Sequence, residues 1–91
     1  MHAQARVVFH GLVQGVTFRA NCRRDAIRRG LTGWVRNRAD GSVEATFEGE
    51  RADVEAAIEW NQTSQPHAQV IRADVAWADP TGEFHVFQIR R

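Results

Sequence analysis

Residues 6–30 have the sequence RVVFHGLVQGVTFRANCRRDAIRRG, in which three local patterns follow one another. The β-branched and aromatic run Arg6–His10 predicts a strand that ends at Gly11. Residues 11–16 contain two glycines and predict a loop. Residues 17–29 change to a helical period, and Gly30 follows as a residue type that commonly ends helices. The first third of the chain is therefore expected to pass from a strand through a glycine-containing loop into a helix.

The predicted helix has one apolar stripe. Phe18, Cys22 and Ala26 recur at four-residue spacing, and most of the positions between them are polar. Thr17 directly precedes the first apolar residue and is placed to cap the helix. We expect Cys22 to be a small core residue of this stripe and not a nucleophile.

A hairpin follows this helix. The strands predicted at Leu31–Asn37 and Ser42–Glu48 are joined by the turn signal Arg38–Gly41. In the second strand, apolar and polar residues alternate strictly, which predicts a half-buried strand with one face in the core. The apolar residues are Val43, Ala45 and Phe47.

The second half of the chain repeats the alternation of helix and strand. Helical spacing of apolar residues predicts a helix from Glu50 to about Gln62. A strand follows, in which Ile71, Ala73, Val75 and Trp77 share a face. A type I turn is predicted at Asp79–Gly82, and a short last strand around Phe87 and Ile89. The order is strand, helix, strand, strand, helix, strand, with one strand appended. We therefore expect a single domain, residues 1–91, with an α+β ferredoxin-like fold: a split βαβ sandwich with two helices on one face of an antiparallel sheet.

Composition excludes several classes of protein. The chain has 91 residues, a net charge of +1 and one cysteine, so neither a disulfide scaffold nor a cysteine-based metal site is expected. No stretch approaches the ~18 consecutive apolar residues of a membrane span, and the N-terminus has no signal-peptide core. All twelve basic residues are arginines, but eleven acidic residues nearly balance them, which argues against general nucleic-acid binding. We expect a cytoplasmic protein, and nothing in the sequence demands more than a monomer.

The loop after the first strand could bind an anion. A glycine-containing loop that leads into a helix can aim successive backbone N–H groups, here those of Val13, Gln14, Gly15 and Val16, at one point near the positive helix end. Arg19, in the first helical turn, could add a planar two-pronged donor for a phosphate. The residues alone leave open that Arg19 is a solvated arginine beside an ordinary turn.

Asn37 is unusual because strands disfavour asparagine. Before a turn, its side chain commonly hydrogen-bonds the local backbone. The alternative is functional: an uncharged amide could hold a water beside an anionic substrate that a carboxylate would repel. No general base is evident near Asn37, since His10 should point along its strand. The four histidines of the chain also lack the spacing of metal ligands, so no metal site is expected.

Two motifs resemble signatures of the acylphosphatase family. Residues 11–19 match G-x-V-Q-G-V-x-F-R, and residues 33–43 are similar to the second signature. The resemblance spans nearly the whole chain, is greatest to free-standing bacterial and archaeal members, and implies hydrolysis of acyl phosphates to a carboxylate and phosphate without metal or cofactor. It also implies that Arg19 binds the phosphate, that Asn37 positions the attacking water, and that the amides of Val13, Gln14, Gly15 and Val16 cradle the phosphate.

The chain departs from the family pattern at Ala20-Asn21-Cys22, where many members carry an aromatic residue, and at Asn61–Pro66, where Gly-Pro is common.

Three alternatives use the same fold. An RNA-binding module needs aromatic platforms on the central strands, but Phe47 shares a face with Val43 and Ala45, which predicts a core position. A metal chaperone needs paired cysteines, and the chain has one. An acylphosphatase-like domain of a carbamoyltransferase would belong to a longer chain, so the length favours the free-standing enzyme. We also hypothesise that a phosphate oxygen of the substrate accepts the proton of the attacking water.

Overall fold

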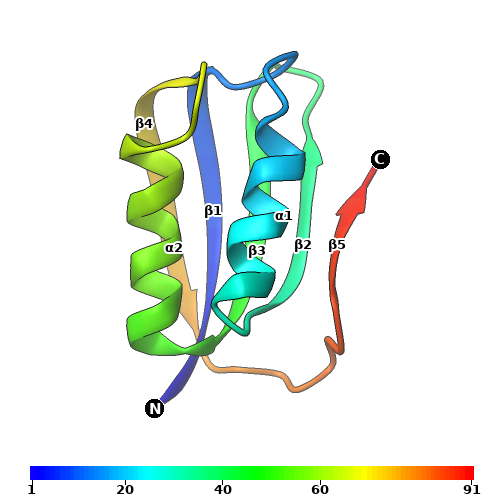
Figure 1. Ribbon diagram of the computed structural model, residues 1–91. Coiled ribbons are helices and arrows are strands. Elements are labelled where there is room, and N and C mark those ends of the chain that lie inside the picture. Colours follow the sequence, from blue (N-terminus) through cyan, green and yellow to red (C-terminus); the bar gives the residue numbers. More distant parts are fainter.

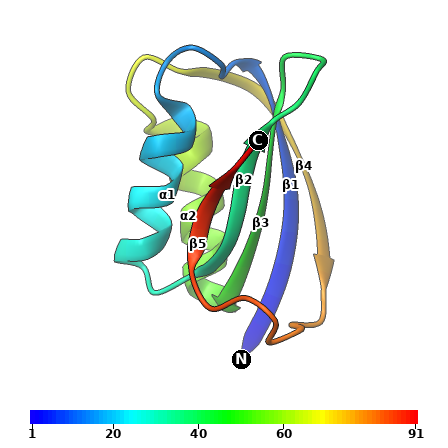
Figure 2. The same cartoon turned by 90° about the vertical axis from the view of Figure 1, so that its right-hand side faces the viewer.

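The computed structural model describes residues 1–91 and places seven elements along the chain. They are β1 (His2–Leu12), α1 (Phe18–Arg28), β2 (Thr32–Asn37), β3 (Val43–Glu50), α2 (Arg51–Thr63), β4 (Gln69–Ala78) and β5 (Phe87–Arg90). The strands form one sheet in the order β4-β1-β3-β2-β5, and both helices cover the same face of it (Figures 1 and 2). The predicted ferredoxin-like α+β fold is confirmed. Neither helix is long and apolar enough to span a membrane.

The hydrophobic core lies between the two helices and the sheet. Its fully buried side chains include Val7 and Phe9 of β1, Phe47 of β3, Phe18 of α1 and Val54 of α2. Burying a side chain of this size contributes about 1.5–3 kcal/mol to the free energy of unfolding. The alternation predicted for β3 thus selects the face that the helices cover.

The polar face of β3 differs from the prediction, because it is buried as well. Glu44, Thr46 and Glu48 are 9%, 1% and 5% exposed. The segment between β4 and β5 reaches Glu48, whose carboxylate accepts hydrogen bonds from the backbone N–H of Thr81 at 3.0 Å and of Gly82 at 2.7 Å. The expected type I turn at residues 79–82 is not closed by a backbone hydrogen bond.

The prediction for β4 is wrong at Ile71. Between His10 and Gly11 the pairing of β1 with β4 shifts by one residue, so that Ile71 has no partner on β1. This bulge reverses the faces: Val70 packs against the core, whereas Ile71 is 79% exposed. Gly11 is required here, because a Cβ on it would lie 2.1 Å from the carbonyl oxygen of Gln69.

Two further details correct the predictions. The last strand, β5, pairs with β2 in parallel, whereas all other pairs in the sheet are antiparallel. Thr17 occupies the position before α1, but it has a left-handed φ of 57°, and its hydroxyl donates to the Val16 carbonyl instead of capping the helix. Gly30 does end α1, and the Leu31 N–H donates to the Ala26 carbonyl at 2.9 Å.

Candidate functional site

The loop that joins β1 to α1 exposes a run of unused backbone donors. The N–H groups of Val13, Gln14, Gly15, Val16 and Thr17 donate to no other group of the protein. Gly15 adopts a φ of 75°, which is a conformation that glycine tolerates best, and the loop turns there without obstruction. Free N–H groups beside the positive end of a helix are an anion-binding arrangement.

Arg19 lies in the first turn of α1, directly after this loop, and is half-buried. Its guanidinium makes no hydrogen bond and no ion pair with the protein. Other arginines of the chain are engaged: Arg29 pairs with Asp25 at 2.9 Å and Arg36 with Glu44 at 2.8 Å. A half-buried arginine without a partner is available to a ligand, and its planar head suits two oxygens of a phosphate.

Asn37 is the last residue of β2 and shares the helix-covered face with Val35. Its side-chain Oδ1 is buried and has no hydrogen bond partner. The alternative in which Asn37 hydrogen-bonds its own backbone is therefore not what the structure contains. Because leaving a buried acceptor unpaired costs about 1–3 kcal/mol, this oxygen is best explained as a site for a water or a ligand.

These groups line two adjoining hollows. The smaller one, of about 180 Å³, is lined by Val13, Gly15, Thr17, Phe18, Arg19, Ala20, Asn37 and Ile89. The larger one, of about 490 Å³, is lined by Arg19, Asn37, Ile89 and Arg91. The structure therefore brings the predicted Arg19 and Asn37 together with Val13 and Gly15, whereas Gln14 and Val16 do not line either hollow. Val16 packs partly against the core.

Sequence reasoning missed Ile89 and Arg91. Their position depends on the parallel pairing of β5 with β2, in which Val35 faces Ile89 and Arg36 faces Arg90. Alternation along β5 then directs Ile89 to the side of Asn37 and Arg90 to the opposite face, where it lies over the Trp34 ring at 4.9 Å. Arg91 directly follows β5 and lines the larger hollow. The only signal in the sequence was the alternation of the last strand, which does not say which strand it joins.

Gln14 has a role that the sequence did not indicate. Its side-chain amide donates to the carbonyl oxygens of Arg38 and Ser42, at 2.8 and 2.9 Å. Both carbonyls belong to the turn that follows Asn37. The loop of free N–H groups is thereby tied to the hairpin that carries the asparagine.

The hollows contain no side chain that could act as a general acid or base near neutral pH. Their lining residues include no Asp, Glu, His or Cys. His10 lies on the outer face of the sheet, where its Nε2 is 3.1 Å from Asp74 and 3.3 Å from Arg72. No cluster of three or more potential metal-ligating side chains is present in the chain. The outer face of the central strands β1 and β3 carries no Phe, Tyr or Trp on which RNA bases could stack.

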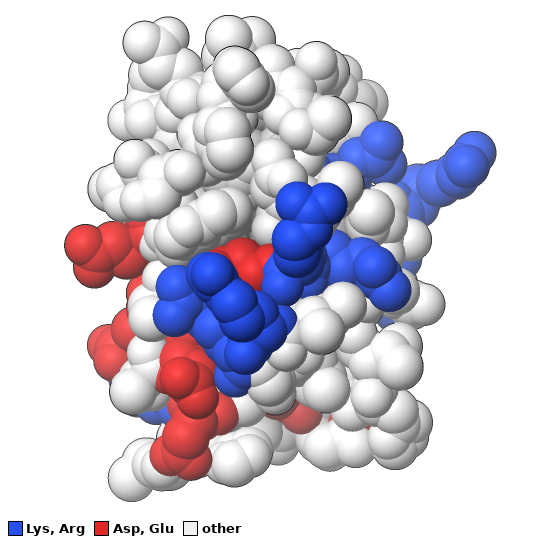
Figure 3. Space-filling view, in the orientation of Figure 1, with Lys and Arg blue, Asp and Glu red and all other residues white.

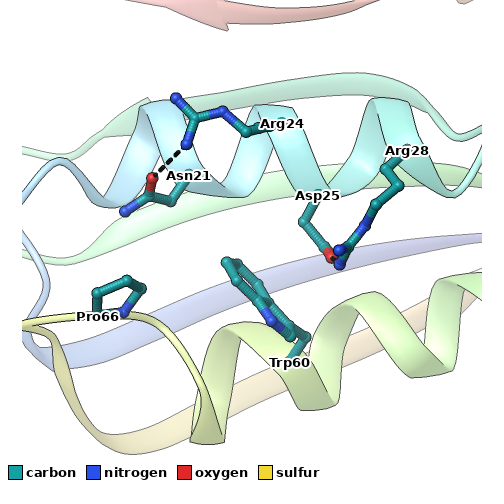
Figure 4. Close-up of a pocket in the computed structure, with 6 residues that line it drawn as sticks. All are labelled: Asn21, Arg24, Asp25, Arg28, Trp60 and Pro66. Atoms are coloured by element: carbon teal, nitrogen blue, oxygen red, sulfur yellow. Dashed lines mark hydrogen bonds and ion pairs between the residues drawn. The ribbon is translucent and has the colours of Figure 1, made fainter.

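A third hollow lies between α1 and α2 (Figure 4). It is lined by Asn21, Arg24, Asp25, Arg28, Trp60 and Pro66, and Trp60 points from α2 toward α1. Its charged groups already have partners, since Arg24 donates to Asn21 at 3.3 Å and Arg28 pairs with Asp25. Basic side chains gather over α1 and acidic ones over α2 (Figure 3). We regard the hollow at Arg19 as the functional one, because its polar groups are free.

The segments that depart from the family pattern, residues 20–22 of α1 and residues 61–66 at the end of α2, lie close together. Gln65 Nε2 donates to the Phe18 carbonyl at 3.0 Å and to Asn61 Oδ1 at 2.9 Å. Cys22 is fully buried beside them. Burial raises the pKa of its thiol, the nearby Asp25 charge adds to this, and a hydrogen bond with Asn61 opposes it. The expectation that Cys22 is a core residue is confirmed.

Known proteins match this chain over nearly its whole length. A family model described as Acylphosphatase matches residues 5–89. An acylphosphatase of Pelotomaculum thermopropionicum is 49% identical over 87 residues, which are 96% of this chain and 95% of that protein. The acylphosphatase structure from Bacillus subtilis has a TM-score of 0.93 at 34% identity and covers 98% of this chain and 99% of its own.

A full-length HypF structure in a phosphate- and nucleotide-bound form is also similar, with a TM-score of 0.82 and 28% identity, but the match covers 12% of that chain. The relatives named acylphosphatase match along nearly all of their own length. The family model spans residues 5–89, and these relatives are almost half identical to this chain. The chain therefore belongs to the acylphosphatase family.

Proposed function

We propose that Arg19 and the N–H groups of Val13, Gln14, Gly15 and Val16 bind the phosphate of the substrate, and that Asn37 holds the attacking water. As a member of its family, the protein is a hydrolase that acts on acid anhydrides of the acyl phosphate type. One observation carries the assignment of residues: Val13 and Gly15 of the loop with free N–H groups, the unpaired Arg19 and the unpaired Asn37 Oδ1 line one hollow.

The reaction needs little acid–base help, because an acyl phosphate is already an activated anhydride. Water bound at Asn37 attacks phosphorus, the bond from phosphorus to the acyl oxygen breaks, and the carboxylate leaves with the electron pair of that bond. The water proton passes to a phosphate oxygen, so that the products are a carboxylate and inorganic phosphate. Positioning of the water and stabilisation of charge on the equatorial oxygens can supply most of the catalysis.

The absence of Asp, Glu, His and Cys from the lining supports transfer of the proton to the substrate. The rate should then show no dependence on a protein group with a pKa near that of histidine. A pH–rate profile controlled by such a group would contradict this step.

The acyl group would extend from the phosphate into the larger hollow, over Ile89 and Arg91. Ile89 offers an apolar surface that is 40% exposed. Ala20, a small residue, also lines the smaller hollow. We therefore propose broad tolerance for the acyl group. We also propose that the enzyme is a cytoplasmic monomer, because Arg19, Asn37 and the loop form the site without a partner and a single cysteine implies no oxidising compartment.

The first test is release of phosphate from synthetic benzoyl phosphate by the purified protein, with and without a strong chelator. Equal and fast hydrolysis in both conditions is the expected result. Loss of activity with the chelator would contradict a metal-free site. A folded protein that hydrolyses no acyl phosphate would contradict the proposed function as a whole.

A further inference from the structure

The side chain of Gln14 connects the two halves of the site. Its Nε2 uses both hydrogens, one on the Arg38 carbonyl at 2.8 Å and one on the Ser42 carbonyl at 2.9 Å. These two residues face each other at the mouth of the hairpin, where the Arg38 N–H donates to the Ser42 carbonyl at 2.9 Å. One side chain thus joins the loop to residues that are 24 and 28 positions away in sequence.

The location of Asn37 depends on the backbone around it. Its side chain makes no hydrogen bond with the protein, and its Oδ1 is buried without a partner. Asn37 and Val43 form the last pair between β2 and β3, and the pairing of β2 with β5 ends one residue earlier, at Arg36. Beyond Asn37 the chain enters the turn, and Gln14 holds the first carbonyl of that turn. A displacement of this turn would therefore move Asn37 relative to the loop.

We infer that Gln14 is a positioning residue whose side chain sets the distance between the phosphate in the loop and the water at Asn37. This inference rests on the proposed roles of Arg19 and Asn37. The rate of an in-line displacement falls steeply with misalignment, and a 1 Å error can cost about 10²-fold. Phosphate binding uses Arg19 and the main chain of the loop, so the side chain of Gln14 should affect turnover and spare binding.

The test replaces Gln14 by methionine, which has a similar length but no donor. Gln4→Met is the matched control. The Gln4 Nε2 likewise donates a part-buried hydrogen bond, to Glu48 at 2.9 Å, but it lies on the outer face of the sheet, away from the hollow. We expect kcat for benzoyl phosphate to fall about 10- to 100-fold in Gln14→Met. The inhibition constant of inorganic phosphate should stay within about twofold, since the donors to phosphate remain. Gln4→Met should change neither constant.

A double-mutant cycle separates positioning from a general loss of structure. If Gln14 acts through Asn37, the variant Gln14→Met/Asn37→Ala should be about as slow as Asn37→Ala alone, because residues that act as a unit are not additive. A full further loss in the Asn37→Ala background would overturn the inference. A large rise in the phosphate inhibition constant of Gln14→Met would overturn it too, because it would place the effect in binding.

Two outcomes remain distinct from these. An inactive wild type would refute the proposed function and not the linkage. If Gln14→Met shows no native circular dichroism, Gln14→Asn replaces it in the double-mutant cycle. The asparagine side chain is polar like glutamine, but it is one methylene too short to reach both the Arg38 and the Ser42 carbonyls. Native turnover in Gln14→Asn would then refute the inference, and a kcat loss that disappears in the Asn37→Ala background would support it.

Discussion

The buried carboxylate of Glu48 is fully hydrogen-bonded, whereas the polar groups at the hollow of Asn37 have no partner in the protein. The Glu48 carboxylate accepts hydrogen bonds from Gln4, from the N–H and hydroxyl of Thr81 and from the N–H of Gly82. At the other place, Asn37 Oδ1, the Arg19 guanidinium and the N–H groups of the loop have no protein partner. Satisfied groups hold the segment between β4 and β5 on the sheet. The unsatisfied groups at the hollow are available to a ligand, and leaving a buried acceptor unpaired costs stability.

The largest effect is expected from Arg19→Ala. Removing an electrostatic donor from such a site costs about 10²–10³-fold in kcat, whereas the free energy of unfolding should change by less than ~0.5 kcal/mol because Arg19 has no protein partner. Arg19→Lys should restore only part of the activity, since an ammonium lacks the planar fork. Steady-state kinetics and urea unfolding check both statements. Near-normal turnover of Arg19→Ala would remove the basis of the comparison.

Asn37→Ala should reduce kcat by about 10²-fold and leave the phosphate inhibition constant nearly unchanged. Its stability should be equal to or above that of the wild type, because the variant removes a buried acceptor that has no partner. Asn37→Asp should in addition weaken phosphate binding, because a carboxylate repels the anion. Kinetics with phosphate as inhibitor, together with thermal unfolding, distinguish these cases. A strongly destabilised Asn37→Ala would show that the residue is structural.

Glu48→Gln tests the satisfied region. Burial alone would raise the pKa of Glu48, but hydrogen bonds from Thr81, Gln4 and Gly82 outweigh it and lower the pKa. A depressed pKa stabilises the folded state above the unfolded pKa of about 4.5, and this contribution is lost as the pH falls through the folded pKa. At pH 7 the variant should lose about 1–3 kcal/mol of unfolding free energy with unchanged kcat.

The difference between Glu48→Gln and the wild type should shrink as the pH is lowered below about 4.5, which urea unfolding at several pH values can follow. Glu83→Gln is the control, because Glu83 is an exposed glutamate of the same connecting segment without an ion pair. If both variants behave alike, the hydrogen bonds of Glu48 contribute nothing measurable.

The smallest effect is expected from Arg91→Ala. Arg91 is an exposed cation at the larger hollow, and its loss should raise KM about two- to fivefold at low salt, which corresponds to ~0.5–1 kcal/mol. This difference should fade near 1 M salt, where the Debye length is about 3 Å. Arg90→Ala is the neighbouring control, since Arg90 lies over Trp34 on the outer face. Equal changes in KM for both variants would refute a specific contribution of Arg91.

Much of the fold was accessible from local patterns. The element order and most boundaries follow from periodicity and from the glycines, as at the end of α1. What failed depended on distant parts of the chain. Burial of Thr46 and Glu48 requires the connecting segment to return across the sheet, and the exposure of Ile71 follows from a one-residue shift against β1. The Thr17 hydroxyl does not cap α1, because Thr17 has a left-handed backbone conformation.

The candidate site could be predicted only in part. The local patterns made the loop, Arg19 and Asn37 candidates, and the resemblance of their motifs to the acylphosphatase signatures singled them out; their roles stay predictions. Ile89 and Arg91 could not, since their direction is set by the strand that β5 joins. The amide of Gln14 escaped notice because a glutamine side chain has no preferred partner until tertiary structure brings carbonyls within reach.

The glycines of residues 11–19 are under different constraints, which bears on how such a motif changes during evolution. Gly11 is needed by the sheet, since any Cβ would collide with Gln69, whereas Gly15 has open space around it and serves the turn of the loop. A descendant that lost the reaction would be free to replace Arg19 but not Gly11, and replacement of Gly15 would strain the backbone at its φ of 75° without a steric clash. Comparing which letters of the motif survive would then separate inactive descendants from enzymes before any assay.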